Sequence, residues 1–293
     1  MELERYLERR IRKKFDKERL TFGMYRPYVK RNLYFDKHFN GRTYQLFNIF
    51  PFLGCLNKVI WIKTGPGMPS FSIVTWYIPD VFTTGGSQCL PLYRYDKNSD
   101  RIDNITDWGL TQFQTHYNDS SITKEDIFHY TYAVLHHPAY RKKYELNLKR
   151  EFPRLPFYNN FFQWVEWGKQ LMDLHLNYET IEPYGLTRTD ATTNTQPKAK
   201  LKADKEKGYI DLDGITFLQD IPAIAWDYKL GNRSALEWIL DQYKEKKPKD
   251  PTIAKLFNTY RFADYKEHVI DLLQRVCTVS VKTMEIIGQM PDE

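Results

Sequence analysis

The sequence is poor in cysteine and has no long apolar run. Its three cysteines, Cys55, Cys89 and Cys277, are odd in number and show no CxxC spacing, which argues against a disulfide framework and a structural zinc site. No stretch approaches the roughly 20 consecutive apolar residues of a membrane-spanning helix. The amino-terminal segment is too charged for a secretory signal. These features predict a cytoplasmic protein with no membrane partner.

Motifs for catalysis are scarce as well. The segment Gly65-Pro66-Gly67 lacks the length and the lysine of a GxxxxGK(S/T) phosphate loop. Adjacent histidines in a tight turn cannot easily face one metal ion, so the pair His136-His137 is interpreted as structural. The residue types of a metal-dependent nuclease site occur at Pro79-Asp80 and, far downstream, at Asp227-Tyr228-Lys229. Such a spacing often arises by chance. We therefore expect no catalytic residue and no metal ligand in this chain.

The 293 residues contain 42% hydrophobic and 16% aromatic residues, enough for a sizeable core. The net charge of +6 is concentrated at the start of the chain, because residues 1–31 hold eleven Lys or Arg against five Asp or Glu. Residues 1–24 are predicted to form a charged linker helix, since a helix that is polar nearly all round usually bridges domains. A phosphate-contacting arm is the alternative interpretation.

Residues 25–121 are predicted to form a β-rich part. Short β-branched or aromatic runs, VIWI, FSIVTWYI and LPLYRY, alternate there with turn sequences. Polar side chains interrupt this framework in the turn around Gln88 and in the loop that contains Arg94, Lys97 and Asn98. We consider these four residues candidates for contact with a ligand, because polar side chains on turns and loops can reach a bound partner.

Residues 122–186 are predicted to form a helical scaffold. Thr123 and Asp126 have the spacing of a capping box, and Pro138 suits the first position of a second helix, which Pro153 ends. Lys142 and Lys143 lie on the basic outer surface of this second helix. A third helical pattern follows from residue 160 to residue 179.

Residues 187–208 are predicted to be a basic polar loop, and residues 209–293 a hairpin turned at Gly214 followed by carboxy-terminal helices. The segment KEKKPKDP is interpreted as a break between two of these helices. The overall class is α+β, with a β-rich first half packed on a helical cluster. The loop offers cations for phosphates and amides for base edges: Arg188, Asn194, Gln196, Lys198, Lys200 and Lys202. A solvated loop without a ligand remains the alternative.

Residues 230–238, LGNRSALEW, begin a further helix. Arg233 could bind a phosphate there, because a guanidinium and unpaired helix amides converge. In the alternative interpretation, Asn232 or Ser234 caps the helix and Arg233 pairs with a carboxylate such as Glu237. The sequence does not separate these two roles.

Several blocks together resemble one known family. The segment DIFHYTYAVLHHPAYRKKYELNLKREFPRLPF resembles the carboxy-terminal specificity region of type ISP restriction-modification enzymes, which join a helicase, a nuclease and an adenine methyltransferase in one chain. Further blocks follow one another in the order that this family shows, and the resemblance covers about residues 20–288. These blocks are Tyr25-Arg26-Pro27-Tyr28, Leu33-Tyr34-Phe35, Ser87-Gln88-Cys89-Leu90-Pro91-Leu92-Tyr93, Asp173-Leu174-His175, Asn177-Tyr178-Glu179 and the LGNRSALEW block. Several long blocks in one order are a specific signal.

The resemblance implies a DNA target recognition domain that selects the site for methylation and cleavage. Double-stranded DNA would be its ligand, and methyltransferase and helicase/nuclease modules its partners, in the same chain or in another. This sequence lacks the Asp/Asn-Pro-Pro-Tyr/Phe tetrapeptide and the FxGxG segment of the methyltransferase. S-adenosylmethionine, ATP and Mg²⁺ are therefore expected only in those other modules, and no cofactor in this chain.

Two alternatives to DNA recognition remain. The chain could be a fragment or subunit of an adenine-specific DNA methyltransferase with residual cofactor binding. It could also be a structural docking subunit that reads no bases and whose basic first helix binds a nuclease or helicase.

Overall fold

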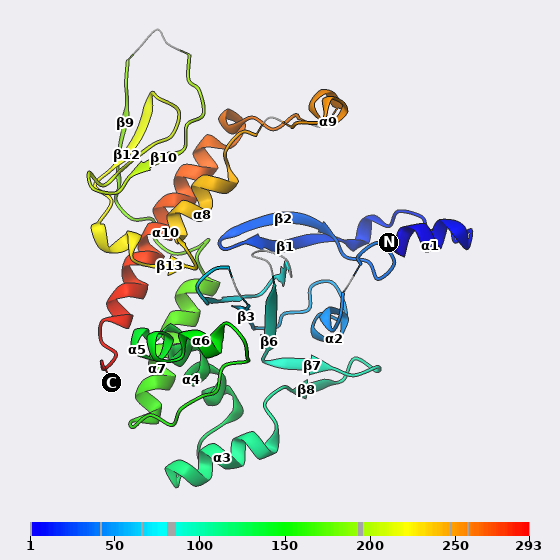
Figure 1. Ribbon diagram of the computed structural model, residues 1–293, viewed down its shortest axis with the longest axis vertical. Helices are drawn as coiled ribbons and strands as arrows, with labels where there is room; N and C mark the ends of the chain where they lie inside the picture. Colours follow the sequence, from blue (N-terminus) through cyan, green and yellow to red (C-terminus); the bar gives the residue numbers. More distant parts are fainter. Residues whose placement is uncertain are drawn as a thin grey trace. The chain divides into compact units, whose positions relative to one another are not determined.

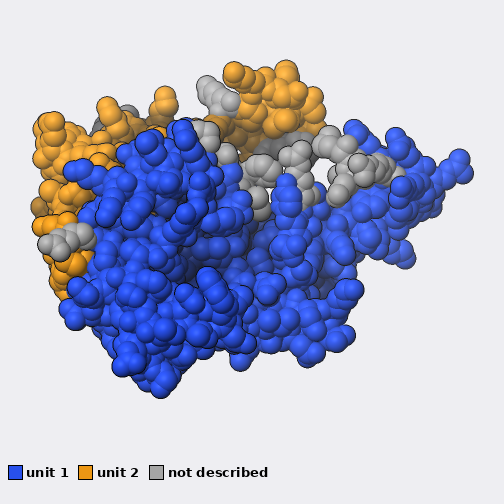
Figure 2. Space-filling model, turned by 60° about the horizontal axis from the view of Figure 1, so that its bottom comes forward, with its two compact units in different colours: residues 1–26, 30–172 blue, residues 27–29, 173–293 orange. Residues whose placement is uncertain are grey.

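The computed structural model describes residues 2–41, 43–65, 67–80, 86–192, 196–246, 248–256 and 258–292. Short strands and helices are mixed along the chain, which confirms the predicted α+β class (Figure 1). The chain divides into two compact units, which Figure 2 shows in different colours. Unit 1 contains residues 1–26 and 30–172, and unit 2 contains residues 27–29 and 173–293.

The start of unit 1 differs from the predicted charged helix over residues 1–24. Helix α1 covers only Glu2–Glu8, a 3-10 turn η1 follows at Lys17–Arg19, and strand β1 occupies Leu20–Arg26. Residues 9–16 are exposed, so packing gives a helix there little support. Strand β1 lies between β2 (Val29–Tyr34) and β5 (Ile78–Pro79), where the β-ladder decides its conformation.

The rest of the β-rich part contains the predicted strands. Strand β3 (Val59–Lys63) is buried throughout and lies antiparallel between β4 (Ser72–Thr75) and β6 (Ser87–Pro91). Strands β7 (Tyr93–Tyr95) and β8 (Arg101–Asp103) form a separate hairpin. A short helix α2 (Leu46–Ile49), not predicted from the sequence, adds Ile49 to an apolar cluster with Phe35, Phe50 and Val59.

Helices make up the second half of unit 1. They are α3 (Asp107–Tyr117), α4 (Lys124–His136), α5 (Pro138–Lys143), α6 (Glu145–Leu148) and the part of α7 (Phe161–Leu176) up to Met172. The capping box of Thr123 and Asp126 and the helix start at Pro138 are confirmed. The helix that begins at Pro138 is shorter than predicted, because Tyr144 leaves the helical region with φ −107° and ψ 19°.

Gly168 sets how closely α7 approaches α4. A Cβ atom at this position would lie 1.9 Å from the backbone oxygen of His129, far inside van der Waals contact. Both helices bury apolar side chains beside this crossing, among them Tyr130, Ala133 and Trp164. Glycine is therefore required for the packing of this scaffold.

Unit 2 contains a four-stranded antiparallel sheet of order β10-β11-β12-β9, which we call the C-terminal sheet. Its strands are β9 (Thr187–Asp190), β10 (Lys202–Asp204), β11 (Tyr209–Asp211) and β12 (Thr216–Gln219). The predicted hairpin at Gly214 is confirmed, with φ +85° at the glycine. The predicted loop over residues 187–208 is wrong at both ends, because β9 and β10 pair with the two edges of that hairpin.

The remaining elements of unit 2 are mostly helical. They are the 3-10 turn η2 (Ala223–Trp226), the strands β13 (Lys229–Leu230) and β14 (Arg233–Ser234), the helices α8 (Ala235–Gln242) and α9 (Pro251–Leu256), the 3-10 turn η3 (Phe262–Tyr265) and the long helix α10 (Lys266–Ile287). Helix α10 buries Leu273, Val276 and Cys277 in the core. No helix among the described residues is both long and apolar enough to span a membrane.

Candidate nucleic-acid interface

One end of the C-terminal sheet carries four of the predicted DNA-contact residues, three on a loop and one at the start of the adjoining strand. The described residues that follow β9 and those that precede β10 lie beside the β11–β12 turn. Backbone hydrogen bonds hold both sides of this loop: the amide of Ala191 donates to Ile215 O (2.9 Å), and that of Lys198 to Asp213 O (2.9 Å). We call residues 191–192 and 196–201, together with the turn over residues 212–215, the sheet tip. Gln196, Lys198 and Lys200 lie on it, and Lys202 begins the adjoining strand β10.

Alternation along the strands gives the C-terminal sheet a buried face and an exposed face. Ile210, Leu218 and Thr216 are completely buried on the inner face. Lys202 and Asp211 are register partners on the other face, and Asp211 is also opposite Phe217. Lys202 is exposed, so it extends the polar surface of the sheet tip onto the open face of the sheet.

Apart from Lys202 and Lys198, most lysines and arginines of this region form ion pairs with aspartate or glutamate. The guanidinium of Arg188 pairs with Asp190 Oδ2 at 2.9 Å and with Glu267 Oε2 at 2.7 Å. Lys200 Nζ pairs with Asp211 Oδ2 at 2.9 Å, and Lys205 Nζ pairs with Glu237 Oε1 at 2.7 Å. The charges of these three cations are thus largely balanced within unit 2.

The innermost pair joins the sheet to helix α10. Lys266 Nζ lies 2.7 Å from Asp213 Oδ2, and the exposed fractions of the two side chains are 20% and 4%. Lys266 also donates to the Thr216 hydroxyl, which in turn donates to Asp190 Oδ1 at 2.6 Å. The network therefore runs without interruption from α10 through β12 to β9.

Two aspartates in this network have shifted pKa values. Burial raises the pKa of Asp213, but the hydrogen bonds from Lys266 and from the Thr216 and Ile215 amides outweigh burial, so the pKa is lowered overall. The hydrogen bond from the Thr216 hydroxyl, followed by that from Arg188, lowers the pKa of Asp190. Hydrogen bonds from Arg188 to Glu267 and Asp190 raise the pKa of the guanidinium. Each of these groups is held in its charged form.

Lys198 and Lys202 differ from these residues. Both side chains are exposed, and neither lies within ion-pair distance of a carboxylate among the residues that the structure describes. The predicted contact Asn194 lies outside the described residues. Of the loop candidates, Gln196, Lys198 and Lys202 therefore present polar groups to solvent, whereas Arg188 and Lys200 are paired.

Arg233 has a different carboxylate partner from the one that the sequence suggested. Its Nη1 lies 3.4 Å from Asp241 Oδ2, and its guanidinium carbon is 5.0 Å from the centroid of the Trp238 ring. Ser234 caps α8 in a capping box with Glu237, whose carboxylate accepts from the Ser234 amide. Because Glu237 is occupied by the cap and by Lys205, Arg233 pairs one turn further along α8. A phosphate contact by Arg233 stays a prediction.

The candidates in unit 1 fall on three places: the β7–β8 hairpin, strand β6 and helix α5. Arg94 is exposed on β7, and Lys97 and Asn98 occupy the β7–β8 turn, where Asp96 accepts from the Asn98 amide at 2.8 Å. Gln88 is exposed on the neighbouring strand β6. Lys142 and Lys143 are exposed on α5. DNA contacts by these residues remain predictions.

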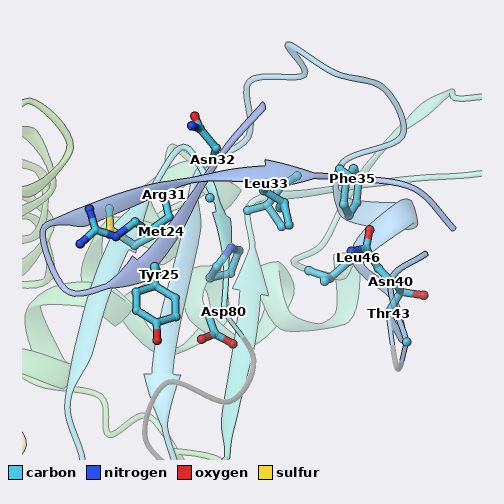
Figure 3. Close-up of a pocket in the computed structure, with 14 residues that line it drawn as sticks. Met24, Tyr25, Arg31, Asn32, Leu33, Phe35, Asn40, Thr43, Leu46 and Asp80 are labelled. Carbon is cyan, nitrogen blue, oxygen red and sulfur yellow. The ribbon is translucent and has the colours of Figure 1, made fainter. Parts of the chain in front are cut away.

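A cavity of about 230 Å³ lies elsewhere in unit 1 and does not fit a phosphate. In Figure 3, Leu33, Phe35 and Leu46 lie on one side of it, and Tyr25 and Asp80 on the other. Asp80 accepts from Arg26 at 2.7 Å, and Arg31 is the one cation among the described lining residues. With one cation and one carboxylate, the described lining has no net positive charge to attract phosphates, so the cavity is not part of the candidate interface. No group of three or more possible metal ligands occurs among the described residues.

Comparisons with known proteins address the family. A family model described as the type ISP C-terminal specificity domain matches residues 1–272. The chain is similar to the structure of a DrdV–DNA complex, with 49% identity and a TM-score of 0.93 over 98% of this chain and 30% of that one. A comparison with curated proteins gives no match.

Two further solved structures are similar. One is a nuclease-deletion mutant of the type ISP restriction-modification enzyme LlaGI in complex with a DNA substrate mimic, with 30% identity and a TM-score of 0.79 over 99% of this chain and 26% of that one. The other is the ATP-dependent type ISP enzyme LlaBIII bound to DNA, with 29% identity and a TM-score of 0.83 over 99% of this chain and 19% of that one. The chain thus spans less than a third of the length of each of these three proteins. The predicted resemblance is confirmed, and the chain belongs to the type ISP C-terminal specificity domain family.

Proposed function

We propose that this chain is the DNA target recognition module of a type ISP restriction-modification system. The observation that carries the proposal is its 49% identity, over nearly its whole length, to part of a protein whose structure is that of a DNA complex. Two more distant type ISP relatives of the same fold are also in complex with or bound to DNA. Double-stranded DNA is therefore the ligand that fits this chain best.

The sheet tip supplies the two kinds of contact that target recognition needs. Lys198 and Lys202 are exposed cations suited to phosphates, which determine affinity and its salt dependence. Gln196 is an exposed amide that can donate to and accept from an adenine edge in the major groove. The backbone hydrogen bonds of Ala191 and Lys198 hold the flanks of this loop on the sheet. We assign base reading to the sheet tip for this reason.

Catalysis belongs in this proposal to other modules. The relatives are more than three times as long as the part that this chain matches, and the methyltransferase tetrapeptide and the phosphate loop do not occur in this sequence. S-adenosylmethionine, ATP and Mg²⁺ would then bind to methyltransferase and helicase/nuclease modules, in the same chain or in a partner. This chain would place them on the target site.

Selection from a random duplex pool tests the proposal. The chain is incubated with the pool, bound duplexes are recovered over several rounds, and binding to random and selected duplexes is measured by electrophoretic shift at two salt concentrations. We expect enrichment of one sequence and an affinity that falls with salt. Absence of binding at low salt would contradict the proposal.

Two single variants separate base reading from phosphate contact. Gln196→Ala should relax the selected sequence at one position with little change in the salt dependence of binding. Lys198→Gln should weaken binding to all duplexes alike and lower the slope of log K against log salt by about 1. If both variants bind the same sequence with the same affinity as the wild type, the sheet tip is not the reading element.

A further inference from the structure

A second basic region of unit 2 lies between α8 and η3. We define the basic arm as the described residues 244–246, 248–256 and 258–261, which include α9. All six residues of α9 are exposed, and none of its side chains is buried. Figure 1 shows α9 projecting away from α8 and α10. The arm therefore contributes nothing to the apolar core, although unit 2 holds it at both ends.

Two hydrogen bonds close the base of the arm. The Tyr260 hydroxyl donates to Tyr243 O at 2.9 Å, and the Phe262 amide donates to Glu245 Oε1 at 2.9 Å. Tyr243 and Phe262 are themselves buried, with exposed fractions of 4% and 2%. The arm thus starts and ends at fixed points beside the core of unit 2, which reduces the conformational entropy that it would lose on binding a ligand.

The acidic residues of the arm are engaged by backbone amides. Glu245 accepts from the Phe262 amide, and Asp250 accepts from the Ile253 amide at 2.9 Å in the first turn of α9. The exposed cations have no carboxylate within ion-pair distance among the described residues; they are Lys244, Lys246, Lys249, Lys255 and Arg261. Arg261 donates to the backbone oxygens of Asn258 and Tyr260, which carry no net charge. The described arm residues hold five cations against two acids, so the arm keeps a net positive charge and none of these cations is held in an ion pair by described residues.

We infer that the basic arm binds the phosphate backbone of duplex DNA and adds affinity without reading sequence. This inference rests on the proposed function and assigns a second contact region to it. Cations that the protein leaves unpaired are the ones that can replace the counterions of DNA phosphates, and release of these counterions drives binding. Lysine is a compact point charge that contacts a phosphate without a fixed geometry, and lysine predominates in the arm.

A protein module is the competing ligand for the arm. Ile253 and Leu256 are exposed by 48% and 58%, and residues three apart lie on the same side of a helix. Two apolar side chains on a helix of six residues form a small contact, whereas the unpaired cations extend along the whole arm. The charge therefore favours DNA, and the two apolar residues provide a control.

Three variants test this inference: one removes cations of the arm, one is a charge control outside the arm, and one removes the two exposed apolar side chains of α9. The first variant replaces Lys246, Lys249 and Lys255 with Gln. The charge control replaces Lys169, Lys229 and Lys282 with Gln; these are exposed lysines on three other elements, so the net charge changes equally. The third variant is Ile253→Ser with Leu256→Ser. Urea unfolding of each variant confirms that it is folded before DNA binding is measured.

We expect the arm variant to bind random and selected duplexes about tenfold or more weakly at low salt, with a slope of log K against log salt reduced by up to about 3. The sequence that it selects should not change. The charge control and the double serine variant should each bind within about twofold of the wild type, since neither removes a phosphate contact.

The possible outcomes separate this inference from the proposed function. If the wild-type chain binds no duplex at low salt, the proposed function fails, and the arm inference fails with it. If the wild type selects a sequence but the arm variant binds as tightly and with the same slope, the arm inference alone is wrong. Equal losses in the arm variant and the charge control would also overturn it, because net charge would then explain the effect. A loss of DNA binding confined to the serine variant would also overturn it, because the two apolar side chains and not the cations would then carry the contact.

Discussion

The C-terminal sheet and the basic arm are both rich in lysine and arginine, but they differ in how many of these cations form ion pairs with carboxylates. In and beside the sheet, Arg188, Lys200 and Lys266 lie within ion-pair distance of aspartate or glutamate, and only Lys198 and Lys202 among the described candidate cations do not. In the arm, the two acids accept from backbone amides, and the described lysines have no carboxylate within ion-pair distance among the described residues. A count of cations therefore does not locate a nucleic-acid surface; what matters is which cations the fold leaves unpaired.

The largest expected difference between the two regions is in stability. Lys266→Met removes the partner of the buried Asp213, which should lower the free energy of unfolding by about 3 kcal/mol. Lys255→Met in the arm should change it by less than about 0.5 kcal/mol, because the side chain is exposed and unpaired. Urea unfolding of both variants measures the contrast. Equal losses would show that the arm, too, is part of the folded core.

Acid should weaken the sheet through the same pair. Because the folded pKa of Asp213 lies below the ordinary value of 3.8, its contribution is fully present above that value and is lost as the pH falls through the folded pKa. Stability of the wild type should therefore decline steeply below pH 3.8. Lys266→Met should show a shallower decline, whereas the arm variant of Lys246, Lys249 and Lys255 should follow the wild type. Chemical unfolding at a series of pH values tests this, and identical slopes for all three proteins would contradict it.

A smaller effect is expected where the sheet is tied to α8. Ser234→Ala removes the hydroxyl that accepts from the Glu237 amide, and loss of such a cap costs about 1 kcal/mol. Lys205→Gln, which breaks an ion pair with the same Glu237, should cost less, because Lys205 is 45% exposed. Thermal unfolding at low and high salt distinguishes them: the Lys205 effect should shrink with salt and the Ser234 effect should not.

Arg188 is also expected to contribute little to stability. Its pairs are exposed, so Arg188→Gln should lower the free energy of unfolding by less than about 1 kcal/mol. Because Asp190 and Glu267 balance its charge, the same variant should also weaken DNA binding less than Lys198→Gln does. Anisotropy titrations with a labelled duplex compare the two. A greater loss for Arg188 would mean that its ion pairs open when DNA binds.

Local signals in the sequence predicted much of the fold. The capping box at Thr123, the turn at Gly214 and the helix start at Pro138 each depend on residues close in the chain, and the structure contains all three. Of the two caps that the sequence offered for the later helix, Asn232 or Ser234, the structure uses Ser234. The predictions that failed depended on distant partners. Residues 20–26 form β1 because β2 and β5 flank them, and β9 and β10 form because the hairpin offers two free edges.

The candidate site was predicted less completely than the fold. The basic character of residues 187–208 was recognised from composition, but the neutralisation of Arg188 was not, since Glu267 lies 79 residues further along the chain. The arm was missed because KEKKPKDP was interpreted only as a break between helices. A charge count over this segment would have identified it as basic. It would not have shown that Glu245 accepts a hydrogen bond from the Phe262 amide.

By itself, the sequence determined the α+β class, the family and the abundance of cations in the second half of the chain. These properties depend on residue order and on interactions within a few residues. The tertiary structure decided which of those cations are available to a ligand. Ion pairing depends on distances of about 3 Å between side chains far apart in the chain, such as Lys266 and Asp213, and only the folded arrangement of strands and helices sets those distances.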